Sequence, residues 1–223
     1  MLLLAVHISN GVLEPTWFIG GFVVMVIALI PALWKLDELD IPRIGVLTAA
    51  FFVASQAHIP LVVVSVHLLL NGLVGIILRR RAAIAIAVGL VMQALLFGHG
   101  GLDSLGMNFC VLAIPAWLTG LIFFQLRTRL RPGFALGAAL GLFCATFTVL
   151  LHVSVLYFGA RGDWTVLAIS SLVAHIPVIV LEGIGVGFAV KVLAKGKPEW
   201  IGLEPEMIAQ PSDRKISSNG TSH

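Results

Sequence analysis

The sequence predicts an all-α, polytopic membrane protein with about seven transmembrane helices. Hydrophobic residues make up 59% of the 223 residues, charged residues make up only 11%, and the mean hydropathy is +1.04. A soluble core of this size does not require so large an apolar share. The apolar stretches are also separated by short polar or glycine-rich turns, which is typical of a chain that crosses a bilayer several times.

Seven apolar segments follow one another along the chain, and prolines mark several of their boundaries. Pro31 is expected to kink the inner end of the first segment, Pro60 separates the second from the third, and Pro115 is expected to bend the fifth. The second to fourth segments fall below the roughly 20 residues of a simple span, which favours a thinned or partly re-entrant region. The predicted helices cover residues 16–34, 44–57, 61–78, 82–97, 108–126, 133–158 and 164–194.

The basic residues predict the orientation of these helices. If the amino terminus lies outside, Arg161 is the one residue among the 14 lysines and arginines that falls outside. Cytoplasmic loops are enriched in Lys and Arg, so the carboxyl terminus is expected in the cytoplasm. The small net charge of +3 reports this asymmetry and gives no indication of nucleic-acid binding. We expect a multi-pass protein of the bacterial plasma membrane with a membrane domain over 16–194 and a flexible cytosolic tail over 195–223.

The histidines gather on the outer side or in the outer half of this topology. His67 is predicted about two turns below the outer end of the third helix, on one stripe with Asn71 and Gly75. A polar side chain at that depth costs several kcal/mol unless it finds a partner. A site rich in imidazole and poor in carboxylate suits Co²⁺, Ni²⁺, Cu²⁺ or Zn²⁺ better than Mg²⁺ or Ca²⁺. The other histidines with this bias are His7, His58, His99, His152 and His175.

Structural interpretations stand beside this metal hypothesis. Four of these histidines could equally be hydrogen-bonding residues between helices: His58, His99, His152 and His175. Gln93 and Asn108 are expected in that role. Glu182 could pair with an inner basic residue or form part of a docking surface for a cytoplasmic partner. A rival class is a haem- or redox-cofactor-binding membrane protein with His67 and His175 as axial ligands across a helix pair.

Four stretches of the sequence match the pattern of a known family. They are His-Ile-Ser-Asn-Gly-Val-Leu at 7–13, Ser-Val-His-Leu-Leu at 65–69, the block at 93–108 from Gln-Ala-Leu-Leu-Phe-Gly to Gly-Met-Asn, and Ala-His-Ile-Pro at 174–177 with Glu-Gly at 182–183. With these stretches the sequence resembles the CbiM/NikM family, the substrate-binding membrane subunits of energy-coupling-factor (ECF) transporters for cobalt or nickel. The resemblance covers most of the chain to Ala194 and implies seven helices with the amino terminus outside.

The resemblance implies that residues 1–15 are a metal-binding segment that tucks back into the helical bundle. His7 would supply an imidazole and its amide nitrogen, and His67 would supply a second imidazole. Val6 would supply the terminal amine if translation starts there. Four nitrogens in a plane favour Ni²⁺, Cu²⁺ or low-spin Co²⁺, and affinity should fall as pH drops through the imidazole range. Auxiliary residues near the metal would be Asn71, His99, His58 and His175.

Three features depart from the family pattern. Five residues precede Val6, so we hypothesise a start at a GTG codon there, or processing after Ala5. The family's glycine-rich turn before the third-helix histidine is replaced by Leu-Val-Val-Val at 61–64, and His99 stands where a loop aspartate is common.

The resemblance implies transport of Co²⁺ or Ni²⁺ and no enzymatic activity of the chain itself. The sequence has no P-loop, so ATP hydrolysis is expected from partner chains. The implied partners are a coupling transmembrane subunit, a pair of cytosolic ATPases and a small accessory membrane subunit. No resident cofactor is expected, and the sequence does not distinguish cobalt from nickel.

Overall fold

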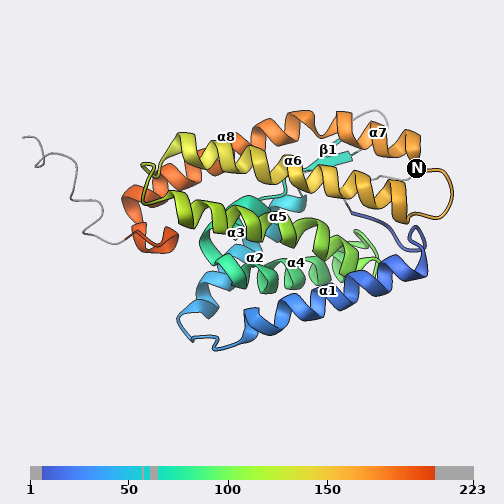
Figure 1. Ribbon diagram of the computed structural model, residues 1–223, viewed down its shortest axis with the longest axis horizontal. Coiled ribbons are helices and arrows are strands. Elements are labelled where there is room, and N and C mark those ends of the chain that lie inside the picture. Colours follow the sequence, from blue (N-terminus) through green and yellow to red (C-terminus); the bar gives the residue numbers. More distant parts are fainter. Residues whose placement is uncertain (1–6, 57, 61–64, 204–223) are drawn as a thin grey trace, which may run out of the picture.

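The computed structural model describes residues 7–56, 58–60 and 65–203, which form an elongated helical bundle (Figure 1). Helices α5, α6 and α8 run side by side along its length, and α1 packs against α5. The helices are α1 (Pro15–Leu33), α2 (Asp40–Gln56), α3 (Asn71–Leu78), α4 (Ala82–Phe97), α5 (Leu105–Leu126), α6 (Phe134–Gly159), α7 (Thr165–Ala174) and α8 (Ile176–Gly196), with short 3-10 turns η1 (Arg79–Arg81) and η2 (Pro198–Ile201).

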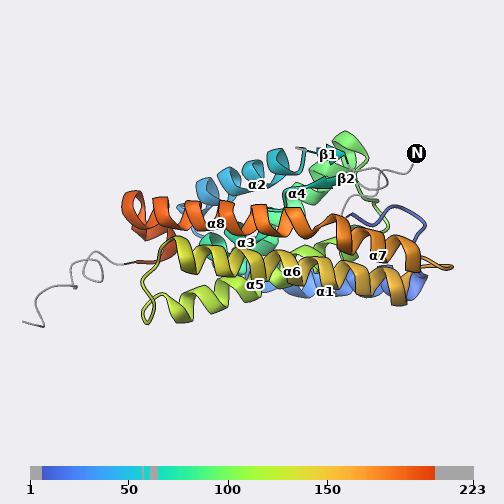
Figure 2. The ribbon, with the colours of Figure 1, turned by 90° about the horizontal axis from the view of Figure 1, so that it is seen from above.

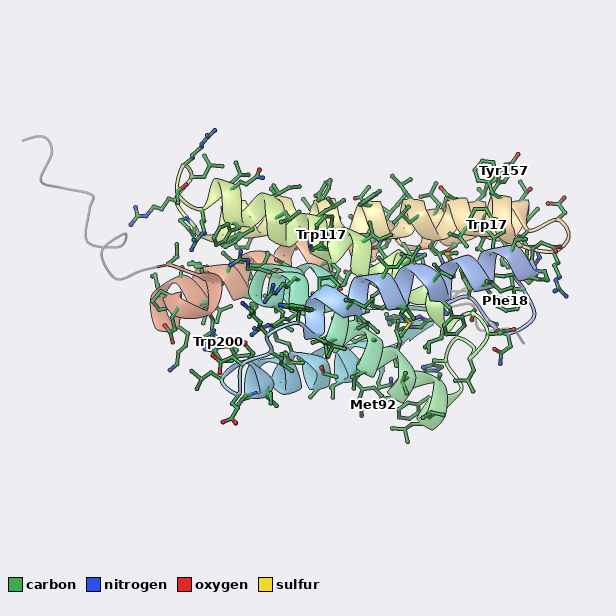
Figure 3. The ribbon with its side chains drawn as sticks, turned by 60° about the horizontal axis from the view of Figure 1, so that its bottom comes forward. Trp17, Phe18, Met92, Trp117, Tyr157 and Trp200 are labelled. Carbon is green, nitrogen blue, oxygen red and sulfur yellow. The ribbon has the colours of Figure 1, made fainter. Side chains whose placement is uncertain are left out.

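The prediction of an all-α, multi-pass membrane protein is confirmed. Within the described residues, α1, α5, α6 and α8 are long and apolar enough to cross a bilayer. Their outer faces carry large apolar side chains, such as Ile27 on α1 with 61% of its surface exposed. Aromatic side chains lie toward both ends of the bundle, with Trp17 and Tyr157 at one end and Trp200 at the other (Figure 3). This distribution is typical of the two membrane–water interfaces.

The predicted third helix, 61–78, is wrong at residues 65–67, and residues 61–64 lie outside the described residues. Residues 58–60 and 65–67 pair as two short antiparallel strands, a hairpin of β1 (His58–Pro60) and β2 (Ser65–His67), with His58 opposite His67. Helix α3 begins only at Asn71, and its 8 residues span about 12 Å. The stripe of His67, Asn71 and Gly75 on one helix is therefore not formed. A segment as short as residues 65–67 shows no periodicity that separates a strand from a helix.

The predicted seventh helix divides into α7 and α8 at His175. Pro177 lies in the first turn of α8 and has no amide hydrogen to continue the hydrogen-bond ladder of α7. By contrast, α1 continues through Pro31 and α5 continues through Pro115. Beyond the expected end of the membrane domain at residue 194, Ile201 and Leu203 pack against the bundle. Residues 204–223 of the expected tail lie outside the described residues.

Glycines bring α3 against α5 at backbone distance. A Cβ added at Gly75 would overlap the backbone of Ala116, and one added at Gly120 would overlap the carbonyl oxygen of Gly75. Close approach of this kind lets dispersion forces hold helices together where lipid supplies no hydrophobic driving force. The short α3, which follows the hairpin directly, is therefore fixed against a long spanning helix.

This packing predicts that Gly120→Ala destabilises the protein by about 1–3 kcal/mol, because the added methyl group has no room. Gly185→Ala on α8 is the matched control, because a Cβ there meets nothing within 4 Å. The control is expected to be neutral or to gain about 0.5–1 kcal/mol from helix propensity. Thermal unfolding of the detergent-solubilised variants measures the difference, and equal midpoints would contradict the packing.

Candidate metal centre

The segment after His7 is held inside the bundle by Asn108 on α5. The side-chain oxygen of Asn108 accepts the amide hydrogen of Ile8 at 2.8 Å, and its Nδ2 donates to the carbonyl oxygen of Ile8 at 3.0 Å. Ser104 Oγ donates to the same carbonyl at 2.5 Å. An amide side chain carries one acceptor and a donor group, so it can satisfy both backbone groups of one buried residue. Asn108, expected between helices, thus acts on the amino-terminal segment.

Further contacts continue this docking toward α1. The amide of Gly11 donates to Asp103 Oδ2 at 2.7 Å, and Asn10 Oδ1 accepts from the amide of Asp103 at 3.3 Å. Leu13 forms an isolated antiparallel bridge with Ala160 after α6. Residues 8–13 are therefore clamped between the loop after α4 and the turn after α6.

The glycines of the loop after α4 leave the space that this segment occupies. Gly100 has a φ of +74°, and a Cβ added there would lie 3.5 Å from the Cβ of His7. A Cβ added at Gly101 would overlap the side chain of Asn10. The glycine-rich loop singled out in the sequence is thus a cradle for the amino-terminal segment.

His7 and His67 come together at the end of this segment. Their rings are nearly parallel, with centroids 5.1 Å apart and an angle of 23° between planes. His7 is 4% exposed and His67 is 2% exposed, so both imidazoles are shielded from solvent. A metal–imidazole bond of about 2.0–2.1 Å puts a ring centroid about 3 Å from the ion. Two rings on one ion therefore have centroids about 4.5–6 Å apart, and the observed separation lies in that range.

Glu182 on α8 fixes the chain directly after His67. Its Oε1 accepts the amide hydrogens of Leu69 and Leu70, the latter at 2.8 Å. The turn is sharp, since Leu70 has a φ of 48°, and the carboxylate is 2% exposed. Neither role considered from the sequence is its role here. A solitary carboxylate in an apolar helix was a visible signal, but its partners are backbone groups that no sequence pattern marks.

The auxiliary candidates are distributed around the bundle. Asn71 donates to the carbonyl oxygen of Leu112 at 3.0 Å and to Thr148 Oγ1 at 2.9 Å, so it ties the start of α3 to α5 and α6. The ring of His99 stacks on Phe97 with centroids 5.9 Å apart.

The remaining candidates are His58 on strand β1, His175 between α7 and α8, and Val6 before His7. His58 pairs with His67 through the backbone of the hairpin. His175 is fully buried at the α7–α8 break, with its Nδ1 2.6 Å from the carbonyl oxygen of Ser171. Val6 lies outside the described residues.

Within the described residues, no three His, Cys, Asp or Glu side chains converge as a metal-binding set. Among the described residues, the histidine side chains brought together here are those of His7 and His67. Figure 2 shows the surroundings: the hairpin lies at the same end of the bundle as α7, away from η2.

The fold is that of a multi-pass membrane protein that buries a pair of imidazoles near one end of its bundle. Residues 7–200 match the CbiM family, described as the cobalt uptake substrate-specific transmembrane region, and the chain belongs to this family. The resemblance read from the sequence is thereby confirmed, and the chain is a transport component.

Relatives and solved structures agree with this assignment. A metal transport protein of Haemophilus influenzae is 34% identical over 86% of this chain and 95% of its own length. A fused cobalt transport protein CbiMQ of Methanocorpusculum labreanum is 26% identical over 95% of this chain, which corresponds to 40% of that longer protein. A crystal structure of a transition metal transporter shares the fold with a TM-score of 0.73 at 24% identity, covering 85% of this chain and 92% of that one.

We expect Glu182→Ala to weaken Co²⁺ or Ni²⁺ binding by roughly 10–100-fold, because residues that orient metal ligands have effects of this size. The substitution leaves two amides near His67 without their acceptor, at a cost of about 1–3 kcal/mol each. Glu182→Gln keeps an acceptor oxygen and should retain most of the affinity. Isothermal titration of the purified variants checks both, and an alanine variant with wild-type affinity would refute the orienting role.

Proposed function

We propose that this chain captures Co²⁺ or Ni²⁺ outside the cell and is the substrate-specific subunit of an ECF-type importer. The observation that carries the proposal is the buried, nearly parallel pair of His7 and His67, whose centroids are 5.1 Å apart. A transition metal is the ligand that two adjacent imidazoles favour at a site where carboxylates do not gather.

The proposed ligand set is the imidazole and amide nitrogen of His7, the imidazole of His67 and the amine of residue 6 as the chain terminus. This set fits the absence of a third coordinating side chain among the described residues. It also gives a role to the hydrogen bonds that Asn108, Ser104 and Asp103 form with the backbone of residues 8–11. Because His7 directly precedes Ile8, these bonds determine where His7 lies. Four nitrogens would favour a square-planar ion over tetrahedral Zn²⁺.

Release would follow from separating the two rings. They lie on different chain segments, because His7 begins the amino-terminal segment 7–13 and His67 lies on strand β2. A relative movement of these two segments would separate the rings and release the ion. The proposed source of that movement is a coupling subunit driven by a pair of cytosolic ATPases, with a small accessory membrane subunit. The fused CbiMQ relative supports the association with a coupling protein. The proposed location is the bacterial plasma membrane, with the amino terminus outside.

The haem-binding alternative loses its geometric basis. It required His67 and His175 to face one another from two helices, but His67 lies on strand β2 and stacks on His7. His175 Nδ1 already lies 2.6 Å from a backbone carbonyl at the α7–α8 break.

We expect His67→Ala to lower the affinity for Co²⁺ and Ni²⁺ by more than about 100-fold, because it removes a ligand and not merely a residue that orients one. His223→Ala in the tail is the matched control and should bind as the wild type does. Titration of the purified chain with each ion, together with uptake in cells expressing the partner subunits, measures the effect. Uptake by His67→Ala at the wild-type level would refute the site.

The proposed amine ligand predicts that the functional chain begins at residue 6. Intact-protein mass spectrometry of the natively expressed protein should therefore show a mass that lacks residues 1–5. A variant forced to retain those residues should bind metal more weakly, because the nitrogen before His7 is then a peptide amide. Retention of residues 1–5 with undiminished affinity would remove the amine from the ligand set and leave the imidazole pair.

A further inference from the structure

A cavity lies at the end of the bundle remote from the imidazole pair. It measures about 600 Å³ and is formed by η1, the first turns of α2, the second half of α5, and η2. Along α5, about 24 Å separates Phe124 at this cavity from Asn108 at the metal centre. Four arginines line it: Arg43, Arg79, Arg80 and Arg81.

The positive charge of this cavity exceeds its negative charge. Its acidic residues are Asp40, which forms a salt bridge with Arg81, and Glu199, whose carboxylate lies 4.0 Å from Lys197. Among the salt bridges of the described residues, none involves Arg43, Arg79 or Arg80. Three guanidinium groups therefore line one cavity without a carboxylate partner in the described chain, and an anion would neutralise them.

Aromatic rings hold the guanidinium groups in place. The guanidinium carbons of Arg79 and Arg127 each lie 3.9 Å from the ring centroid of Phe124, and that of Arg43 lies 5.8 Å from the ring of Trp200. Cation–π contacts of this kind position a guanidinium while leaving its N–H groups able to donate.

The other wall of the cavity is apolar and faces the lipid side. Trp117 and Leu121, on the outer face of α5, are 48% and 37% exposed and line the same cavity as the arginines. Figure 3 shows Trp117 on the side of the bundle and Trp200 at its end, beside the start of α2. A ligand that fills this space would be anionic at the bundle end and apolar along α5.

From this juxtaposition we infer that the cavity binds the headgroup of an anionic phospholipid. The phosphate accepts hydrogen bonds from Arg43, Arg79 and Arg80, and an acyl chain lies along Trp117 and Leu121. Basic pockets between transmembrane helices bind such headgroups, and Arg matches the geometry of phosphate oxygens. Free inorganic phosphate shares the charged half of this chemistry but leaves the apolar wall uncovered, so a lipid is the occupant that both walls fit.

Native mass spectrometry of the full chain tests the inference, with phosphatidylglycerol, phosphatidylcholine or inorganic phosphate as the probe. We expect phosphatidylglycerol to remain bound and the neutral-headgroup lipid to dissociate. In Arg43→Gln/Arg79→Gln, binding of phosphatidylglycerol should weaken by roughly thirtyfold, from about 1 kcal/mol for each arginine. The control Arg129→Gln/Arg131→Gln loses the same charge in the loop after α5 and should bind as the wild type does.

Three results would overturn the inference: equal loss in both double variants, equal retention of both lipids, or binding of inorganic phosphate that excludes phosphatidylglycerol. Thermal unfolding of each variant in detergent establishes that it is folded. If Arg43→Gln/Arg79→Gln does not fold, the single variant Arg43→Gln replaces it, with an expected loss of about fivefold. Metal binding at His7 and His67 is measured separately and should be unchanged, so failure of the lipid site and failure of the metal site are distinguishable.

Discussion

The placement of the imidazole pair depends on the pairing of one buried residue, Ile8, with the side chain of Asn108. An extended segment inside a helical bundle brings backbone N–H and C=O groups into a place where water cannot satisfy them. Asn108 satisfies both groups of Ile8, and Ser104 adds a second donor to the carbonyl. Because His7 directly precedes Ile8, this pairing determines the position of the first imidazole. The glycines at 100 and 101 contribute by leaving the space.

The position of the second imidazole depends on similar hydrogen bonds from a different helix, α8. Glu182 reaches from α8 to the amides of Leu69 and Leu70, directly after His67. In both cases a polar side chain on a rigid spanning helix holds the backbone of an irregular segment, and the imidazole extends from that segment. The two rings are therefore carried by different irregular segments, and each segment is anchored by a side chain of a spanning helix.

The two ends of the molecule carry different chemistry. One end brings together the imidazoles, the hairpin and the amino-terminal segment 7–13, and the other gathers arginines around a cavity with an apolar wall. The orientation expected from the sequence would place the arginine-lined end in the cytoplasm. Helix α5 contributes to both ends, with Asn108 in its first turn and Phe124 in its last.

Composition and segment lengths determined the class of this protein and the approximate places of its long apolar helices, because transfer of apolar residues into lipid is a local, additive property of the chain. The histidine bias to one side, together with the family resemblance, led to the prediction that His7 and His67 lie together, and the structure brings their rings side by side. Only the tertiary structure decided that residues 65–67 form a strand, that α3 begins at Asn71, and that Glu182 binds backbone amides. A segment as short as residues 65–67 satisfies strand and helix equally until its neighbours are present. The partners of a buried polar group lie 100 or more residues away in this chain, at Asn108 for Ile8 and at Glu182 for Leu69 and Leu70. Such pairings come from packing, which no local pattern records.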